Sequence, residues 1–117
     1  MTRTLFTHAR LLDPASRLDR EGEILVSEGS IAAIGEQLPR DGAEIVDCGG
    51  HCLAPGLVDM RVQLREPGDE HQETMATAGA AAAAGGITTM VALPNTDPII
   101  DEFALVEFVA RERRTIR

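Results

Sequence analysis

The 117-residue chain is 44% hydrophobic and 26% charged, which is typical of a soluble globular protein with one ordinary domain core. Its net charge of −8 disfavours a nucleic-acid partner, because phosphate binding requires a basic face. The longest run of small residues, from Ala76 to Gly86, is too short to cross a bilayer of about 30 Å. Two cysteines, Cys48 and Cys52, do not suggest a disulfide scaffold. We therefore expect a cytoplasmic protein that binds neither nucleic acid nor membrane.

The first half of the chain predicts short β-strands. Apolar runs occupy Thr4–Leu12, Glu23–Val26, Ile31–Ile34 and Glu44–Asp47, and the clearest turn is Glu28-Gly29-Ser30. Short strands at close spacing, joined by glycine-containing turns, are typical of small antiparallel hairpins.

The next predicted strand, Leu57–Leu64, alternates in character. Because side chains alternate with period two, one face would carry Leu57, Asp59, Arg61 and Gln63. The other face would carry Val58, Met60, Val62 and Leu64. An apolar face against helices and a polar face along a site are expected of an inner barrel strand.

Two helices and a further strand follow. The alanine-rich stretch predicts a helix from about Gln72 to Ala84, which Gly85-Gly86 would end. Ile87–Leu93 reads as a buried strand, and a last helix is expected from about Glu102 to Arg114. This β-α-β-α order predicts parallel strands joined by a crossover helix.

Four motifs, in this order and spacing, carry a family resemblance. They are Ala54–Met60, Leu64–Gly68, Ala82–Thr89 and Leu93–Pro98. Together they resemble dihydroorotases of the longer type, in the amidohydrolase superfamily, over about residues 4 to 110. Allantoinases carry Asn where Arg65 stands, and dihydropyrimidinases lack the Leu-Arg-Glu-Pro-Gly string.

The resemblance implies an α/β fold: the start of a (β/α)₈ TIM barrel preceded by part of a small β-sandwich. Residues 1–54 would belong to the sandwich, and residues 55–117 would form the first two βα units of an incomplete barrel. Because such a barrel needs about 250 residues, we expect the chain to be a fragment. The alternative is that other chains cover its open surface.

The resemblance also implies two substrate-binding residues. In dihydroorotases an Arg and an Asn hold the carboxylate of dihydroorotate, and by position these are Arg65 and Asn95. A guanidinium offers a rigid fork for a carboxylate, and an amide can donate beside it. The alternative reading pairs Arg65 with a neighbouring carboxylate and places Asn95 in a turn.

One departure from the family concerns metal binding. Where the family has a zinc-binding His-x-His, this chain has Arg61 and Gln63. Arginine has no lone pair to donate, and an amide oxygen is a weaker zinc ligand than imidazole. Two unit charges 4 Å apart repel by about 4 kcal/mol at an effective dielectric of 20, and a divalent ion roughly doubles this. We expect neither a metal nor a catalytic residue here, although the family uses zinc; Arg61 would instead pair with carboxylates that point at the vacant centre.

Other candidate ligands are weaker. Cys48, His51 and Cys52 are soft ligands close in sequence, but they precede the barrel strand and offer no fourth partner, so loop packing is the favoured reading. His71 is expected to be an exposed loop residue, and His8 a structural residue of an early strand.

These readings leave three functions open. The first is a non-catalytic dihydroorotase homologue that serves as a structural partner of aspartate transcarbamoylase in pyrimidine biosynthesis, with a homo-oligomer also possible. The second is the N-terminal fragment of an active dihydroorotase or related cyclic amidohydrolase, which would hydrolyse dihydroorotate to carbamoyl aspartate. The third is a truncated product that does not fold alone.

Overall fold

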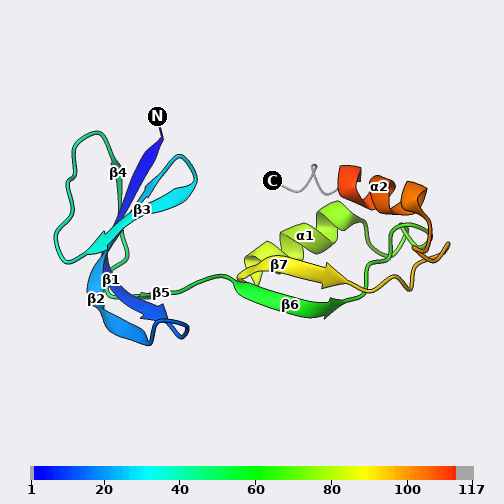
Figure 1. The fold of residues 1–117 in the computed structure, drawn as a ribbon, viewed down its shortest axis with the longest axis horizontal. Coiled ribbons are helices and arrows are strands. Elements are labelled where there is room, and N and C mark those ends of the chain that lie inside the picture. Colours follow the sequence, from blue (N-terminus) through cyan, green and yellow to red (C-terminus); the bar gives the residue numbers. More distant parts are fainter. Residues whose placement is uncertain (1, 113–117) are drawn as a thin grey trace. The chain divides into compact units, whose positions relative to one another are not determined.

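The computed structural model describes residues 2–112. These residues form two units, Met1–Pro55 and Gly56–Arg117, and each is described by itself (Figure 1). The chain is thus a mixed α/β segment with an all-β unit followed by a β-α-β-α unit.

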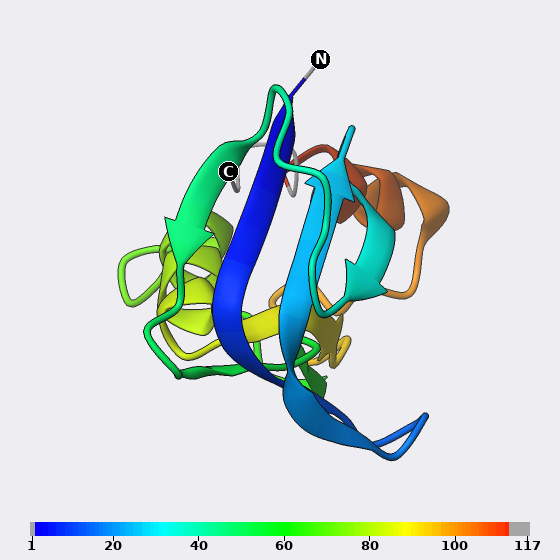
Figure 2. The same cartoon turned by 90° about the vertical axis from the view of Figure 1, so that its left-hand side faces the viewer.

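The first unit is a five-stranded sheet. Its strands are β1 (Arg3–Asp13), β2 (Leu18–Ser27), β3 (Ser30–Gly35), β4 (Glu44–Asp47) and β5 (Cys52–Leu53). The order is β3-β2-β1-β4, with β5 also paired to β1 (Figure 2). Strands β1, β2 and β3 are antiparallel, as predicted. The predicted hairpin arrangement is wrong for β4, because β4 and the unpredicted β5 pair with β1 in parallel.

The predicted Glu28-Gly29 turn is confirmed. Glu28 and Gly29 have φ of 51° and 76°, the left-handed values that a two-residue hairpin requires at both central positions. The turn joins β2 to β3 and sets the pairing of Ser27 with Ser30.

The core of the first unit lies along β1. Leu5, Ala9 and Leu11 are buried there, together with Leu25 of β2. The buried carboxylate of Glu23 accepts a hydrogen bond from the backbone N–H of Leu38 at 2.7 Å, which fixes the segment after β3 to the sheet. In contrast, Ile31 and Ile34 of β3 are exposed and border an apolar groove of about 300 Å³.

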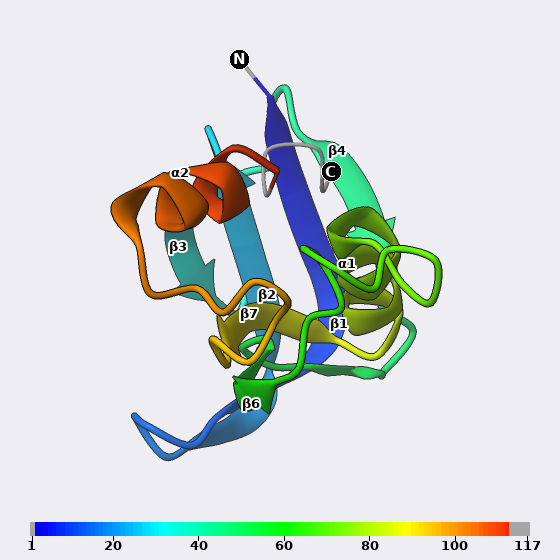
Figure 3. The same cartoon turned by 90° about the vertical axis from the view of Figure 1, so that its right-hand side faces the viewer.

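The second unit pairs two parallel strands and places two helices against them. Its elements are β6 (Leu57–Val62), α1 (Met75–Ala84), β7 (Ile87–Ala92) and α2 (Phe103–Glu112). Both helices lie on the same side of the β6–β7 pair (Figures 1 and 3). The two described strands pair with each other and do not close a barrel. The rest of the predicted last helix, beyond residue 112, lies outside the described residues.

Helix α1 begins three residues later than predicted, for a local reason. Thr74 is the N-cap: its side chain accepts from the backbone N–H of Thr77 at 3.2 Å, and the Thr77 hydroxyl accepts from the N–H of Thr74 at 3.0 Å. This reciprocal capping box satisfies two donors that the first helical turn leaves free. Gly85 ends the helix, as the Gly85-Gly86 pair predicted.

The core of the second unit joins β6 to both helices. Buried Leu64, Met75 and Ala78 form its centre, and Val62 and Phe108 pack against them. The prediction that the apolar face of Leu57–Leu64 meets helices is wrong for its first half within the described residues, because Val58 and Met60 are 56% and 69% exposed. The helices cover only the carboxyl end of this face in the described part of the chain.

No helix within residues 2–112 is both long enough and apolar enough to cross a membrane.

Loss of the Thr74 cap should destabilise α1. In Thr74→Ala the N–H of Thr77 loses its acceptor, and we expect the free energy of unfolding to fall by about 1 kcal/mol. Thr74→Ser keeps the hydroxyl and is the matched control, with a much smaller change expected. Urea unfolding followed by circular dichroism measures both variants. Equal losses in the two would show that the hydroxyl is not what stabilises this end of the helix.

Candidate functional site

The parallel pairing of β6 and β7 builds the candidate site. The carboxyl ends of parallel strands lie at the same edge of a sheet, where ligands of α/β folds commonly bind. Val62 is aligned with Ala92, and the N–H of Leu93 donates to the carbonyl of Val62 at 2.8 Å. All four predicted site residues, Arg61, Gln63, Arg65 and Asn95, therefore lie at or just beyond this edge.

A bulge interrupts β6 just before that edge. Asp59 is aligned with Met90 and Val62 with Ala92, so three steps along β6 match two along β7. The backbone N–H of Arg61 donates to the Asp59 carboxylate at 2.9 Å within the bulge. Because a bulge disrupts strict alternation, the face predicted to unite Asp59 with Arg61 does not follow from their spacing.

Beyond the bulge, alternation describes the end of the strand well. Val62 and Leu64 belong to the core with α1 and α2. Arg61 precedes Val62, and Gln63 lies between Val62 and Leu64. Both Arg61 and Gln63 are exposed. Side chains of successive residues point to opposite faces, so Gln63, which is flanked by two core residues, belongs to the face away from the helices. Arg61 lies within the bulge, and its face does not follow from alternation.

Arg65 and Asn95 occupy the loops that follow the two strands. Both are exposed. The carbonyl of Arg65 accepts from the N–H of Asp69 at 2.7 Å and so forms a tight turn. Within residues 2–112, the Arg65 guanidinium is in none of the ion pairs, so the alternative of a neighbouring carboxylate partner finds no support there.

Three interactions hold these loops in place. The Glu66 carboxylate accepts from the N–H of Met75 at 2.7 Å, at the positive end of α1. The N–H of Asp97 donates to the carbonyl of Pro67 at 3.1 Å, which joins the two loops. Buried Thr96 donates from its hydroxyl to the carbonyl of Pro98 at 2.9 Å. Glu66, Pro67, Thr96 and Asp97 belong to the motifs Leu64–Gly68 and Leu93–Pro98, but the residue types alone do not indicate these contacts.

Glu70 also stabilises the loop between β6 and α1. Its carboxylate accepts from the backbone N–H of Gly68 at 2.9 Å. This hydrogen bond is the main reason why the pKa of Glu70 lies below its ordinary value. The loop after β6 therefore carries a charged Glu70 at neutral pH.

The other predicted ligand candidates lie elsewhere. His51 Nδ1 lies 2.7 Å from the carbonyl of Cys48, and Cys52 is exposed at β5. His8 Nδ1 lies 3.0 Å from the Asp47 carboxylate on the first unit, and His71 is exposed in the loop before α1. Within residues 2–112, no three His, Cys, Asp or Glu side chains gather as a metal-ion site.

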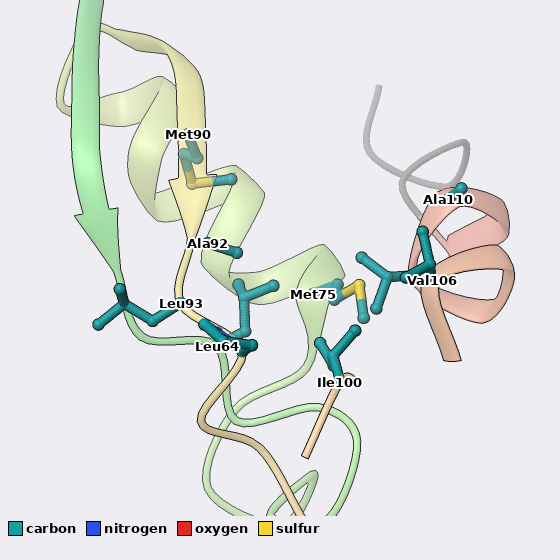
Figure 4. A pocket seen from close by; sticks show the side chains of 10 residues that line it. Leu64, Met75, Met90, Ala92, Leu93, Ile100, Val106 and Ala110 are labelled. Carbon is teal, nitrogen blue, oxygen red and sulfur yellow. The ribbon is translucent and has the colours of Figure 1, made fainter. Parts of the chain in front are cut away.

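The second unit also contains an apolar cavity of about 370 Å³ (Figure 4). Its lining includes Leu64, Met75, Met90, Ile100, Val106 and Val109. Since these side chains offer neither a charge nor a hydrogen bond, the cavity extends the core and does not supply chemistry.

Comparisons with known proteins agree on a family. The sequence profile described as Dihydro-orotase-like matches residues 50–117. The dihydroorotase of Pelobacter propionicus is 44% identical over 111 residues, which cover 94% of this chain and 26% of that protein. The dihydroorotase of Streptococcus pneumoniae is 40% identical over 117 residues, covering 97% and 28%. The chain thus spans about a quarter of the length of these curated relatives.

Solved structures show the same fold. The L-hydantoinase (dihydropyrimidinase) from Arthrobacter aurescens matches 98% of this chain and 25% of its own, with a TM-score of 0.79 and 29% identity. A D-hydantoinase matches 95% and 24%, with a TM-score of 0.70 and 23% identity, which speaks for the fold alone. With more than half of its residues matched by the family profile, the chain belongs to the dihydro-orotase-like family.

Proposed function

We propose that this chain is part of a non-catalytic dihydroorotase homologue of pyrimidine biosynthesis. The observation that carries the proposal is the pair Arg61 and Gln63 at the carboxyl end of β6, where the resemblance expects two zinc-binding histidines. Without such ligands this edge lacks the metal that would polarise the cyclic amide and activate water.

The residues at this edge do not fit a zinc ion. Arg61 is permanently protonated and repels a cation. Gln63 offers an amide oxygen where zinc favours nitrogen or sulfur. The nearest carboxylate on β6 belongs to Asp59, and it already accepts the N–H of Arg61.

The same edge suits a carboxylate. Arg65 and Asn95 follow adjacent parallel strands, are exposed, and can both donate hydrogen bonds. A guanidinium fork binds the two oxygens of a carboxylate, and an amide N–H can add a third contact. We propose that these two residues still bind the carboxylate of dihydroorotate, as the resemblance implies, although metal-dependent catalysis is lost.

The role of the whole protein is a further part of the proposal. We infer a cytoplasmic scaffold that binds aspartate transcarbamoylase. Residues 1–54 would form part of its β-sandwich, and residues 55–117 the first two βα units of its TIM barrel. Two apolar surfaces are exposed: Ile31 and Ile34 on the sheet, and Val58 and Met60 on β6. Their exposure supports the inference that the rest of such a protein covers them.

Restoring the histidines should restore zinc uptake. The purified full-length protein is expected to contain substoichiometric zinc and to show no dihydroorotate turnover, whereas Arg61→His with Gln63→His raises its zinc content. Arg17→His with Gln37→His adds two exposed imidazoles on the first unit and is the matched control. Metal analysis by mass spectrometry measures all three proteins.

Two results would contradict this part of the proposal. Stoichiometric zinc with turnover in the unaltered protein would identify the chain as the N-terminal part of an active dihydroorotase. Equal zinc uptake by the two double variants would show that Arg61 and Gln63 are not where metal binding was lost.

The scaffold role predicts a stable complex. Mixed with purified aspartate transcarbamoylase, the full-length protein should co-elute with it in size-exclusion chromatography with light scattering, and the enzyme alone should form a smaller assembly. Separate elution of the two proteins, with an unchanged enzyme assembly, would refute the scaffold role and leave the missing metal site as a separate result.

A further inference from the structure

We propose that a loop clamp positions Arg65 and Asn95 as a single carboxylate-binding pair. The loop clamp consists of Gly68 and the main chain of Pro67 and Asp97. This inference rests on the proposed carboxylate-binding role of Arg65 and Asn95, and it assigns Gly68 as a positioning residue that does not itself touch the ligand.

The clamp continues the alignment of the strands into their loops. Val62 is aligned with Ala92, which is 30 residues later in the chain. The bonded pair of the clamp, Pro67 and Asp97, is again 30 residues apart. Arg65 and Asn95 have the same separation and lie between these two cross-links. Because the two segments are joined on either side of Arg65 and Asn95, the backbone positions of these two residues relative to each other are fixed.

Glycine at position 68 is what permits the clamp. Gly68 has a φ of +114°, a backbone conformation that other residues rarely adopt. A methyl group at this position would collide with the carbonyl oxygen of Asp97 and lie 2.9 Å from its Cβ. The two loops consequently approach more closely than any side chain at position 68 would allow.

Each loop is also fixed on its own side of the clamp. Glu66 binds the first turn of α1 at 2.7 Å, and Arg65 closes the turn to Asp69 at 2.7 Å. Thr96 is buried and bonds to Pro98 at 2.9 Å. The clamp then joins two supported loops, so the backbone positions that carry Arg65 and Asn95 are fixed before a ligand arrives. Such preorganisation avoids the entropic cost of ordering the two loops on binding.

The test compares two glycines that share a positive φ. In the full chain, Gly68→Ala should weaken binding of L-dihydroorotate by about tenfold or more, because displacement of about 1 Å is enough to lose such contacts. Gly86 has a φ of +77°, and an added methyl there meets no atom within 4 Å. Gly86→Ala thus carries backbone strain without a clash between loops, and its affinity should equal that of the unaltered chain. Isothermal titration calorimetry measures the affinities, and Arg65→Ala serves as the binding-defective reference.

The outcomes separate the clamp from the site that it serves. Loss of binding in Arg65→Ala but not in Gly68→Ala overturns the clamp and leaves the proposed carboxylate site intact. An unaltered chain that does not bind the probe overturns both. Loss in Gly68→Ala together with full binding in Gly86→Ala supports the clamp.

A measurement on the unaltered chain covers the case in which Gly68→Ala does not fold. If binding requires a closed clamp, the ligand must slow the hydrogen exchange of the Asp97 amide by linkage. At a ligand concentration of ten times Kd the slowing should be about tenfold. Amide exchange followed by NMR reports it directly. Unchanged exchange of Asp97 at saturating L-dihydroorotate overturns the clamp, because ligand binding would then be independent of whether the loops are joined.

Discussion

The parallel pairing of β6 with β7 is the constraint on which the rest of the second unit depends. Parallel strands need a crossover, and α1 supplies it between Val62 and Ile87. The same pairing places both carboxyl ends at one edge, so that side chains 30 residues apart in sequence share a site. Glu66 couples the loop after β6 to the crossover helix, because its carboxylate accepts from the N–H of Met75 at the N-terminus of α1.

The guanidinium groups of Arg61 and Arg65 disfavour a cation bound beside them. Arg61 lies near the carboxyl end of β6, Arg65 follows the strand, and both are exposed. Asn95 adds an amide donor from the loop after β7. A guanidinium cannot lose its proton at any usable pH, so both groups stay charged. The proposed function, in which ligand binding is kept and metal-dependent chemistry is lost, rests on these residues.

Several features of the fold were readable from local sequence. Glu28-Gly29 specified its turn because only two-residue turns with left-handed φ match the twist of paired strands. The alanine run and Gly85 specified α1 and its end, and the β-α-β order specified parallel pairing of β6 and β7. The early start predicted for α1 was wrong because helix propensity could not reveal that Thr74 and Thr77 cap each other.

The sequence by itself determined the family, the order of the elements and the chemical character of Arg61, Gln63, Arg65 and Asn95, since these follow from residue types and their spacing. Only the tertiary structure decided the parallel pairing of β4 and β5 with β1, the bulge that includes Arg61 and the close approach of Gly68 to Asp97. These features join residues far apart in the chain. Their geometry depends on how segments without a short connecting turn pair with each other, and no single local motif encodes that pairing.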